Sequence, residues 1–443
     1  MLFLERMRVL LLAIIIAVFL VSLWFLFRDH FSELPLSELQ YKHVAASLMG
    51  GWHFATNCTV GERYLVRTAV VKDLSDVLPF IADAFVETSR KRPKIDLQSP
   101  VPMRNRKRLD IYARVQVNSN GNNKFFANYL WFFSLDESLK LADKGSLVGL
   151  IPPVSSIFDP FGPVDPRGFQ VNGSRFLIYN MGAFFGKQLY LDYTFMFDLT
   201  RGISVTPLVN GHVPLLKGLK KTTRVMRDKH WTPLIVGSEA FFVRYYDPLE
   251  VLQCQLPSGE CHVAHPKDGA REQNYNDFTH PVRGGTQFIQ LQGNYYWSIV
   301  HVTLFPFSEG NSYTRLYTMN FLLMHVKPFR VVFLSDPIVV AESLFSEKSV
   351  KNYTRFKHFC WPNGTEANSD NEIFLGVHVD DKFSALLSVL GHRSVLMHAI
   401  HADRNSEVKE HRQGSLHETA RNLARKFLRP GEKFKVRWNH YYS

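Results

Sequence analysis

The sequence has few cysteines and lacks several motifs that would identify its chemistry. Its 443 residues include four cysteines, with no C-x-x-C pair and a dispersion that disfavours a structural zinc site. It contains no D-x-D, the pattern that holds a metal–nucleotide in many glycosyltransferases, and no G-x-S-x-G, H-E-x-x-H or P-loop. These absences argue against a serine hydrolase, a zinc protease and an NTPase, and we expect neither a metal ion nor another cofactor.

Long amphipathic helical patterns are also missing until near the C-terminus. Short apolar segments alternate instead with Gly, Pro and Asn turns, and the chain contains 36 Phe and 17 Tyr, residues that favour strands. The sequence therefore predicts an all-β fold. The best helix candidate is Glu407 to Phe427, which Pro430-Gly431 would end.

The charge balance is basic, with a formal net charge of +12. Basic runs occur at Arg104 to Arg108, at Lys217 to Lys221 and from Arg421 to Lys435. This balance suits nucleic acid, an anionic membrane or phosphorylated small molecules. No nucleic-acid module has its signature here, so we expect no nucleic-acid partner.

The N-terminus carries one long apolar run. Val9 to Phe27 is an uncharged stretch of 19 residues, which is long enough to cross a bilayer as a helix. A cleaved signal peptide is the alternative, but its apolar core would be shorter and a small-residue cleavage site would follow. Arg6 and Arg8 precede the run, so we expect a cytosolic tail over residues 1–8, a transmembrane signal anchor over 9–27 and a lumenal remainder.

Two further patterns fit a lumenal environment. Sequons for N-glycosylation occur at four positions, Asn57, Asn172, Asn352 and Asn363. Cys254 and Cys261 bracket a turn-rich segment and are predicted to form a hairpin disulfide, whereas Cys58 and Cys360 either pair with each other or stay free. We expect a single-pass type II protein of the Golgi or endoplasmic reticulum membrane.

Five segments share one plan, in which a polar group is followed by a turn and then by a strand. The segments begin at His53, Asp165, Lys229, Arg283 and His358. The last three intervals, 64, 54 and 75 residues, suit four-stranded propeller blades. The first interval, 112 residues, predicts an insertion in blade one or two. A pair of β-sandwiches with coincidental spacing is the alternative.

The predicted architecture is thus a five-bladed β-propeller with an N-terminal transmembrane helix and a C-terminal helix. Residues 28–50 form a stem, residues 51–405 the propeller, and residues 406–443 the C-terminal helix and tail. In a propeller the innermost strands converge on the central axis, so the five polar groups would meet in one funnel.

Asp165 is the first candidate for catalysis. Its carboxylate stands two residues before Arg167, a predicted substrate-binding residue, at the start of a strand, where it could act as an acid or base. The alternative is a turn residue, because Asp-Pro is a common turn dipeptide.

The other candidates are predicted to bind substrate. Lys229, His230 and Trp231 combine a cation, an imidazole and an aromatic face, which suit a phosphate beside a sugar, although Trp231 could equally pack in a blade. Arg283 precedes two glycines that permit close approach of an anionic ligand. His301 ends a strand, Tyr313 follows a turn, and Asp381 could grip sugar hydroxyls or lie in a solvated turn.

These residues, in this order, resemble the five-bladed β-propeller family of β-mannoside phosphorylases (glycoside hydrolase family 130) and the related β-1,2-mannosyltransferases. Val164-Asp165-Pro166-Arg167 is similar to the family's Glu-Asp-Pro-Arg, whose Asp is the catalytic carboxylate. Lys229-His230-Trp231 is similar to the family's Lys-Asn-Trp. The segment from His378 through Asp381 is similar to the family's Tyr-Gly-x-x-Asp, whose Asp binds the reacting sugar. The resemblance also gives Lys229, His301 and Tyr313 anion-binding roles.

The resemblance implies sugar-active chemistry, and the anchor favours a secretory-pathway enzyme. The leading hypothesis is a glycosyltransferase that moves a hexose, mannose from GDP-mannose by resemblance, to a glycan acceptor with inversion. A β-mannoside phosphorylase or hydrolase that uses phosphate in the same pocket is the second hypothesis. A glycan-binding propeller without activity is the third.

Overall fold

The computed structural model describes most of the chain after residue 51 in separate stretches. These are residues 52–56, 63–86, 93–118, 127–149, 162–185, 189–211, 226–228, 230–266, 282–304, 306–307, 316–338, 360–379, 383–405, 416 and 433–434. The predicted tail, anchor and stem lie outside them, as does the predicted C-terminal helix apart from Leu416. The described residues include no helix long and apolar enough to cross a membrane.

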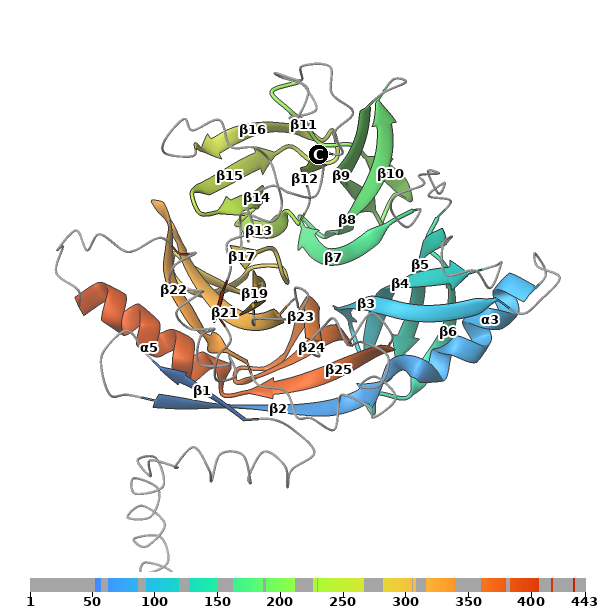
Figure 1. Cartoon of the computed structure of the whole chain (residues 1–443), viewed down its shortest axis with the longest axis horizontal. Coiled ribbons are helices and arrows are strands. Elements are labelled where there is room, and N and C mark those ends of the chain that lie inside the picture. Colours follow the sequence, from blue (N-terminus) through green and yellow to red (C-terminus); the bar gives the residue numbers. More distant parts are fainter. Residues whose placement is uncertain are drawn as a thin grey trace, which may run out of the picture. The chain divides into compact units, whose positions relative to one another are not determined.

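Most strands form five sheets of four or five strands, antiparallel except at β11 and β12, which confirms the five-bladed propeller (Figure 1). Blade 1 contains β3 (Lys94–Asn105), β4 (Arg108–Asn118), β5 (Ala127–Leu135) and β6 (Leu141–Leu147). Blade 2 contains β7 (Val164–Val171), β8 (Ser174–Phe185), β9 (Leu189–Asp198) and β10 (Ile203–Val205), with β12 (Met226–Asp228) parallel to β9. Blade 3 contains β13 (Thr232–Val236), β14 (Glu239–Tyr246), β15 (Leu249–Cys254) and β16 (Glu260–His265), with β11 (Leu208–Val209) parallel to β16.

The last two blades complete the ring. Blade 4 contains β17 (Val282–Arg283) and β18 (Ile289–Gln292), which both pair with β19 (Tyr295–Leu304), followed by β21 (Leu316–Val326) and β22 (Phe329–Pro337). Blade 5 contains β23 (Cys360–Ser369), β24 (Glu372–Val379), β25 (Phe383–Leu390), β2 (Arg63–Asp73) and β1 (Trp52–Thr56). A separate small pair joins β20 (Pro306–Phe307) to β26 (Lys433–Phe434).

The ring closes through the two ends of the propeller sequence. The blue β2 lies beside the red β25 in Figure 1, and the two strands pair antiparallel. The inner strand β3 packs against β7 on one side and β23 on the other, and β7 packs against β13. Radial repetition of this kind protects the inner edge of each blade inside the ring.

The structure corrects the prediction for the first blade. The segment from His53 was taken as the start of an inner strand, but β1 and β2 are the outer strands of blade 5. The long interval before Asp165 therefore holds a whole blade, β3 to β6, rather than an insertion. The basic run at Arg104 to Arg108 spans the β3–β4 turn of that blade.

The apolar core lies between the facing sheets of neighbouring blades. One cluster joins blades 1, 2 and 3, a second joins blades 3 and 4, and a third joins blades 4 and 5. A fourth cluster lies between blades 1 and 5. Because β-strand side chains alternate between faces, aromatic and branched residues on both faces of each sheet can enter these layers.

The sequence analysis missed two helices. The helix α3 (Leu78–Val86), preceded by the 3-10 turn η1 (Leu74–Val77), buries Ile81 and Phe85 in the layer between blades 1 and 5. The helix α5 (His392–Asn405) follows the last propeller strand and packs on blades 4 and 5. It falls within the range 51–405 assigned to the propeller. Asp403 of α5 accepts hydrogen bonds from Arg330 and Tyr295 of blade 4.

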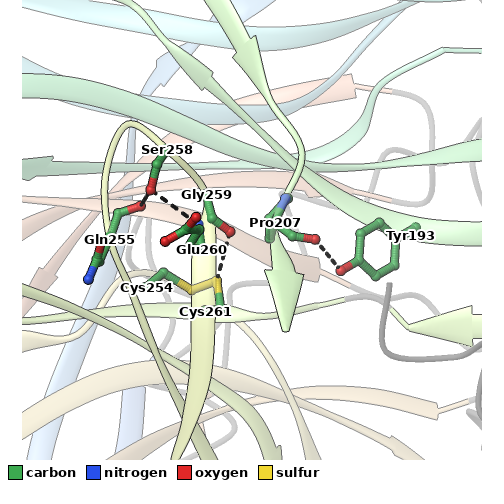
Figure 2. The surroundings of a disulfide bond; sticks show 8 residues. All are labelled: Tyr193, Pro207, Cys254, Gln255, Ser258, Gly259, Glu260 and Cys261. Atoms are coloured by element: carbon green, nitrogen blue, oxygen red, sulfur yellow. Dashed lines mark hydrogen bonds between the residues drawn. A yellow bond between two sulfur atoms is a disulfide. The ribbon is translucent and has the colours of Figure 1, made fainter. Parts of the chain in front are cut away.

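The predicted hairpin disulfide is confirmed in blade 3. Cys254 and Cys261 face each other across the β15–β16 pair and are bonded (Figure 2). The turn between them closes through the amide of Gln255, which donates to the carbonyl of Glu260 at 2.7 Å. At Gly259, φ is +82° and an added Cβ would lie 2.8 Å from the carbonyl oxygen of Thr206. Only glycine fits this turn without strain.

The first residue of α5 makes the stability of the fold depend on pH. His392 is 4% exposed and its ring packs 5.1 Å from that of Trp297, and burial lowers the pKa of His392 from 6.5 to about 4. Below pH 6.5 the unfolded chain binds a proton at this histidine, and the folded chain does so only near pH 4.

We therefore expect His392 to contribute a loss of about 3 kcal/mol of unfolding free energy as the pH falls from 6.5 to 4. Denaturant unfolding of wild type and His392→Gln at both pH values measures this loss. The loss of unfolding free energy between pH 6.5 and 4 should be smaller in the variant by about 3 kcal/mol. His401→Gln, at an exposed position of the same helix, is the control. Equal losses in wild type and His392→Gln would contradict the assignment.

Candidate functional site at the propeller axis

Two matching bulges lie in the inner strands of blades 1 and 2. In β3, Ser99 and Pro100 oppose a single residue of β4, and in β7, Asp165 and Pro166 oppose a single residue of β8. A bulge is one of the few places where a sheet accepts proline. Ser99 and Asp165 both have a φ of 51°. The blade-1 counterpart of Asp165 is therefore Ser99.

The Asp165 carboxylate is held by groups from blade 1. Its Oδ1 accepts a 3.5 Å hydrogen bond from Ser99 Oγ and lies 3.9 Å from Nη1 of Arg114. The Asp165 side chain is 14% exposed. None of the contacts that the structure describes uses Oδ2.

Arg167 is a buried cation that joins three blades. Its side chain is 1% exposed. Nε donates to the carbonyl of Gly285 at 2.5 Å, Nη1 donates to the carbonyl of Asp165 at 3.1 Å, and Nη2 donates to Nδ1 of His230 at 3.1 Å. Burial lowers the pKa of the Arg167 guanidinium, and the nearby Asp165 carboxylate opposes that effect. These donors are directed at the protein, so Arg167 orients the site rather than offering them to a ligand.

His230 is fixed in one orientation and one protonation form. Its φ is 73°, and its backbone amide donates to Oδ1 of Asn180 at 3.2 Å. A guanidinium can only donate, so Nδ1 of His230 must accept from Arg167, and the ring carries its proton on Nε2. The ring meets that of His301 edge-to-face, with centroids 5.3 Å apart.

Blade 5 enters the network through His378 of β24. The Nδ1 atom of His378 lies 3.2 Å from Ser99 Oγ, and both residues are buried. A continuous series of contacts therefore runs from His378 to Ser99, Asp165, Arg167, His230 and His301. It draws on all five blades.

Strained backbone is concentrated at this axis. Among the described residues, seven that are not glycine have positive φ. Ser99, Asp165 and His230 belong to the axial network, whereas the others include exposed turn positions such as Arg106, Asn172 and Asn210. Each such conformation costs about 1–3 kcal/mol and is typical of functional sites. Three residues at the axis therefore adopt backbone conformations that are unfavourable for residues other than glycine.

Glycines allow the inner strands to approach so closely. A Cβ on Gly284 would lie 2.0 Å from the carbonyl oxygen of His230, and one on Gly285 would lie 1.7 Å from that of Ile299. On Gly376 it would lie 2.1 Å from the carbonyl oxygen of Pro100. We expected Gly284 and Gly285 to leave room for an anionic ligand, but protein backbone already occupies this space.

The predicted site residues fall into three groups. Asp165, Arg167, His230 and His301 meet at the axis, and Arg283 is half-buried opposite His301 in the β17–β19 pair. Trp231 is fully buried between Tyr193 and Phe242, so it packs the core between blades 2 and 3 rather than offering its ring to a sugar. Lys229, Tyr313 and Asp381 lie outside the described residues.

The glycosylation candidates are only partly described. Asn172 is exposed in the β7–β8 turn. Asn57 and Asn352 lie outside the described residues, and Asn363 belongs to β23. Among the described residues, no group of three or more His, Cys, Asp or Glu side chains could hold a metal ion.

The sequence analysis did not select Ser99, Arg114, Asn180 or His378. Ser99 stands before a proline in a strand, as Asp165 does, and this shared Xaa-Pro pattern was the available signal. Arg114 and Asn180 lie in the second strands of their blades, where nothing in the local sequence distinguishes them from ordinary strand residues.

A hollow of about 410 Å³ lies elsewhere, where Arg104 and Asn368 of blades 1 and 5 meet loop residues Asp136 to Leu139. None of the axial residues lines it, and Asp136 is already engaged by Ser138 and Lys140. The axial network remains the candidate active site because it combines a carboxylate, cations and strained backbone.

Comparison with known proteins gives structural similarity alone. No protein-family model and no curated protein matches this chain. A solved member of the GH130 mannoside phosphorylases, described with hydrolases that target β-1,2 mannosidic linkages in Candida mannan, has a TM-score of 0.47 and 11% identity. The match covers 66% of this chain and 84% of that one.

Two further solved structures are similar at lower scores. A β-1,2-mannobiose phosphorylase from Listeria innocua has a TM-score of 0.44 and 10% identity over 70% of this chain and 93% of its own. A GDP-Man-dependent mannosyltransferase from Leishmania mexicana has a TM-score of 0.39 and 11% identity, and the match covers 71% of this chain and 94% of that one. These are the kinds of protein that the sequence motifs resemble. All three scores lie below 0.5, so we base the function on the chain's own residues.

The Arg167 contacts predict a specific loss of stability. Lysine cannot reproduce the planar fork that reaches Gly285, Asp165 and His230, so we expect Arg167→Lys to lower the unfolding free energy by about 3–5 kcal/mol. Denaturant unfolding measures the change. Arg104→Lys, a half-buried arginine away from the axis, is the matched control and should cost less than about 1 kcal/mol. Similar losses in both variants would show that Arg167 does not join the blades.

Proposed function

We propose that this protein is a sugar-active enzyme that transfers a hexosyl unit in one displacement at the propeller axis. The observation that carries the proposal is the convergence at Asp165. A strained carboxylate from blade 2 faces Arg114 and Ser99 of blade 1 and leaves one oxygen available. Such a group is suited to take a proton from an attacking hydroxyl or to give one to a departing oxygen.

We infer inversion at the anomeric carbon from the number of carboxylates in the described axial contacts. Asp165 is the one carboxylate in the axial contacts that the described residues make. A glycosyl-enzyme intermediate needs a second, nucleophilic carboxylate, whereas a single acid–base group suits direct displacement with inversion. The acceptor oxygen would attack the anomeric carbon while Asp165 Oδ2 takes its proton.

The leaving or attacking phosphate would bind to the basic side of the site. Arg283 and His301 pair across β17 and β19, and Lys229 immediately precedes His230 in sequence. These groups would stabilise negative charge on a phosphate oxygen in the transition state. By resemblance we assign mannose as the sugar, GDP-mannose as the donor and a glycan as the acceptor. Phosphorolysis of a β-mannoside is the second candidate, because phosphate could attack from the same position.

Assays of the full chain distinguish the two reactions. Transfer from GDP-mannose to a mannoside acceptor without phosphate would support the transferase, and phosphate-dependent release of mannose 1-phosphate would support the phosphorylase. Sugar binding with no turnover would leave a glycan-binding propeller and overturn the enzymatic proposal.

In either reaction, Asp165→Asn should lower kcat by at least about 100-fold, because the amide cannot exchange the proton. The loss is measured with the productive substrate pair at saturating concentrations. Asp370→Asn, at the exposed β23–β24 turn, is the control and should keep wild-type kcat. Turnover that survives Asp165→Asn would show that the carboxylate is not the acid–base group.

We also propose that residues 28–443 lie in the lumen of the Golgi or endoplasmic reticulum, anchored by residues 9–27. The apolar run and the four sequons that follow it support this orientation. Asn172 offers a test because its side chain is exposed at a turn.

Protein from secretory cells should shift in mobility on N-glycosidase treatment, and Asn172→Gln should carry one glycan fewer. Ser174→Thr keeps the sequon and is the matched control, which should retain the glycan. A chain that shows no shift would contradict a lumenal propeller.

A further inference from the structure

Ser99 lies between Asp165 and a histidine from a different blade. Its Oγ is 3.5 Å from Oδ1 of Asp165 and 3.2 Å from Nδ1 of His378. Ser99 is fully buried and His378 is 3% exposed. The proposed reaction uses Asp165 but gives no role to Ser99 or His378.

The position of Ser99 is fixed by its surroundings. It occupies the β3 bulge with a φ of 51°, and Pro100 lies against Gly376 of β24, where a Cβ would approach its carbonyl oxygen to 2.1 Å. Two residues earlier, the Leu97 carbonyl accepts a 2.8 Å hydrogen bond from Ser384 Oγ. Blades 1 and 5 are therefore joined on both sides of the hydroxyl.

A serine hydroxyl can accept one proton while it donates another. With Asp165 ionised, the carboxylate can only accept, so Ser99 donates its proton to Asp165 Oδ1. With Asp165 protonated, the carboxyl can donate to Ser99 Oγ while Ser99 donates to His378. The three groups thus form an unbroken path for one proton.

We propose that Ser99 and His378 are positioning residues that form a proton relay and return Asp165 to its ionised state after each turnover. The relay rests on the proposed function, because it needs Asp165 to receive the acceptor proton. As the glycosidic bond forms and the phosphate leaves, the acceptor O–H proton moves to Asp165. The carboxyl then turns about its Cβ–Cγ bond so that its protonated oxygen faces Ser99. Asp165 gives that proton to Ser99 Oγ, and Ser99 gives its own proton to His378 Nδ1.

The balance of this step is complete. Ser99 ends with the same number of protons, Asp165 is again a carboxylate, and His378 becomes an imidazolium that later releases the proton to water. In phosphorolysis the same path runs backwards and supplies the proton for the departing sugar oxygen.

Three variants of the full chain test the relay with the productive substrate pair. Ser99→Ala removes the link, and His378→Asn keeps an acceptor near the position of Nδ1 but cannot take up a proton. We expect each to lower kcat by about 100-fold with KM changed less than about 3-fold. Ser388→Ala removes a buried β25 hydroxyl that bonds Glu372 and should keep wild-type kcat. Unfolding midpoints report whether each variant is folded.

Rates in mixtures of H₂O and D₂O separate a relay from a structural role. A path that moves several protons gives a curved dependence of kcat on the deuterium fraction, and a single transfer gives a straight line. We expect a curve for wild type and Ser388→Ala, and a line for Ser99→Ala.

The outcomes distinguish the relay from the reaction it serves. Absence of wild-type turnover would overturn the proposed function and the relay together. Loss of turnover in Asp165→Asn with unchanged kcat in Ser99→Ala would overturn the relay alone. A wild-type kcat in His378→Asn, or a straight line for wild type, would also overturn it. A curve that persists in Ser99→Ala would place the protons on another path.

Discussion

The buried guanidinium of Arg167 is the constraint on which the axial site depends. It reaches the carbonyls of Asp165 and Gly285 and the ring of His230, so one side chain connects blades 2, 3 and 4. A guanidinium taken out of water must satisfy its donors to remain stable. The unusual backbone at Asp165 and His230 supplies suitably placed acceptors. Burial of this charge and local strain are therefore parts of one arrangement.

The same arrangement separates the roles of residues that look equivalent in sequence. Asp165 and Arg167 stand two positions apart, and both were predicted to act on substrate. In the folded chain Arg167 is directed into the protein, whereas Asp165 keeps one oxygen outside the contacts described here. Trp231 differs in the same way from its neighbour His230, because its ring packs between aromatic residues. Chain proximity places these side chains in one region, but strand pleating and bulges decide which of them face a ligand.

Four of the five blades were predictable because their segments share a repeated local pattern, whereas the fifth predicted segment, at His53, lies in an outer strand of blade 5. The strands after Asp165, His230 and Arg283 were foreseen, and so was the hairpin that Cys254 and Cys261 close. Blade 1 was not recognised because its Ser99-Pro100 pair carries no charge, unlike Asp165-Pro166 in blade 2. The closure of β2 on β25 joins residues more than 300 positions apart, and no local pattern encodes such a pairing. The helices α3 and α5 are short and partly buried, so their periodicity was weak.

The sequence led to Asp165, Arg167, His230 and His301 but not to the rest of the axial network. Arg114, Asn180 and His378 belong to second strands, and their roles follow from register rather than from sequence motifs. Ser99, Asp165 and His378 belong to three different sheets, so no strand pairing places them opposite one another. Ser99 nevertheless contacts both of the others. The two matching bulges turn these side chains out of the regular alternation and towards the axis. A bulge adds one residue to its strand. Insertion or deletion of a single residue in either strand would therefore shift the register and separate the groups that the site brings together.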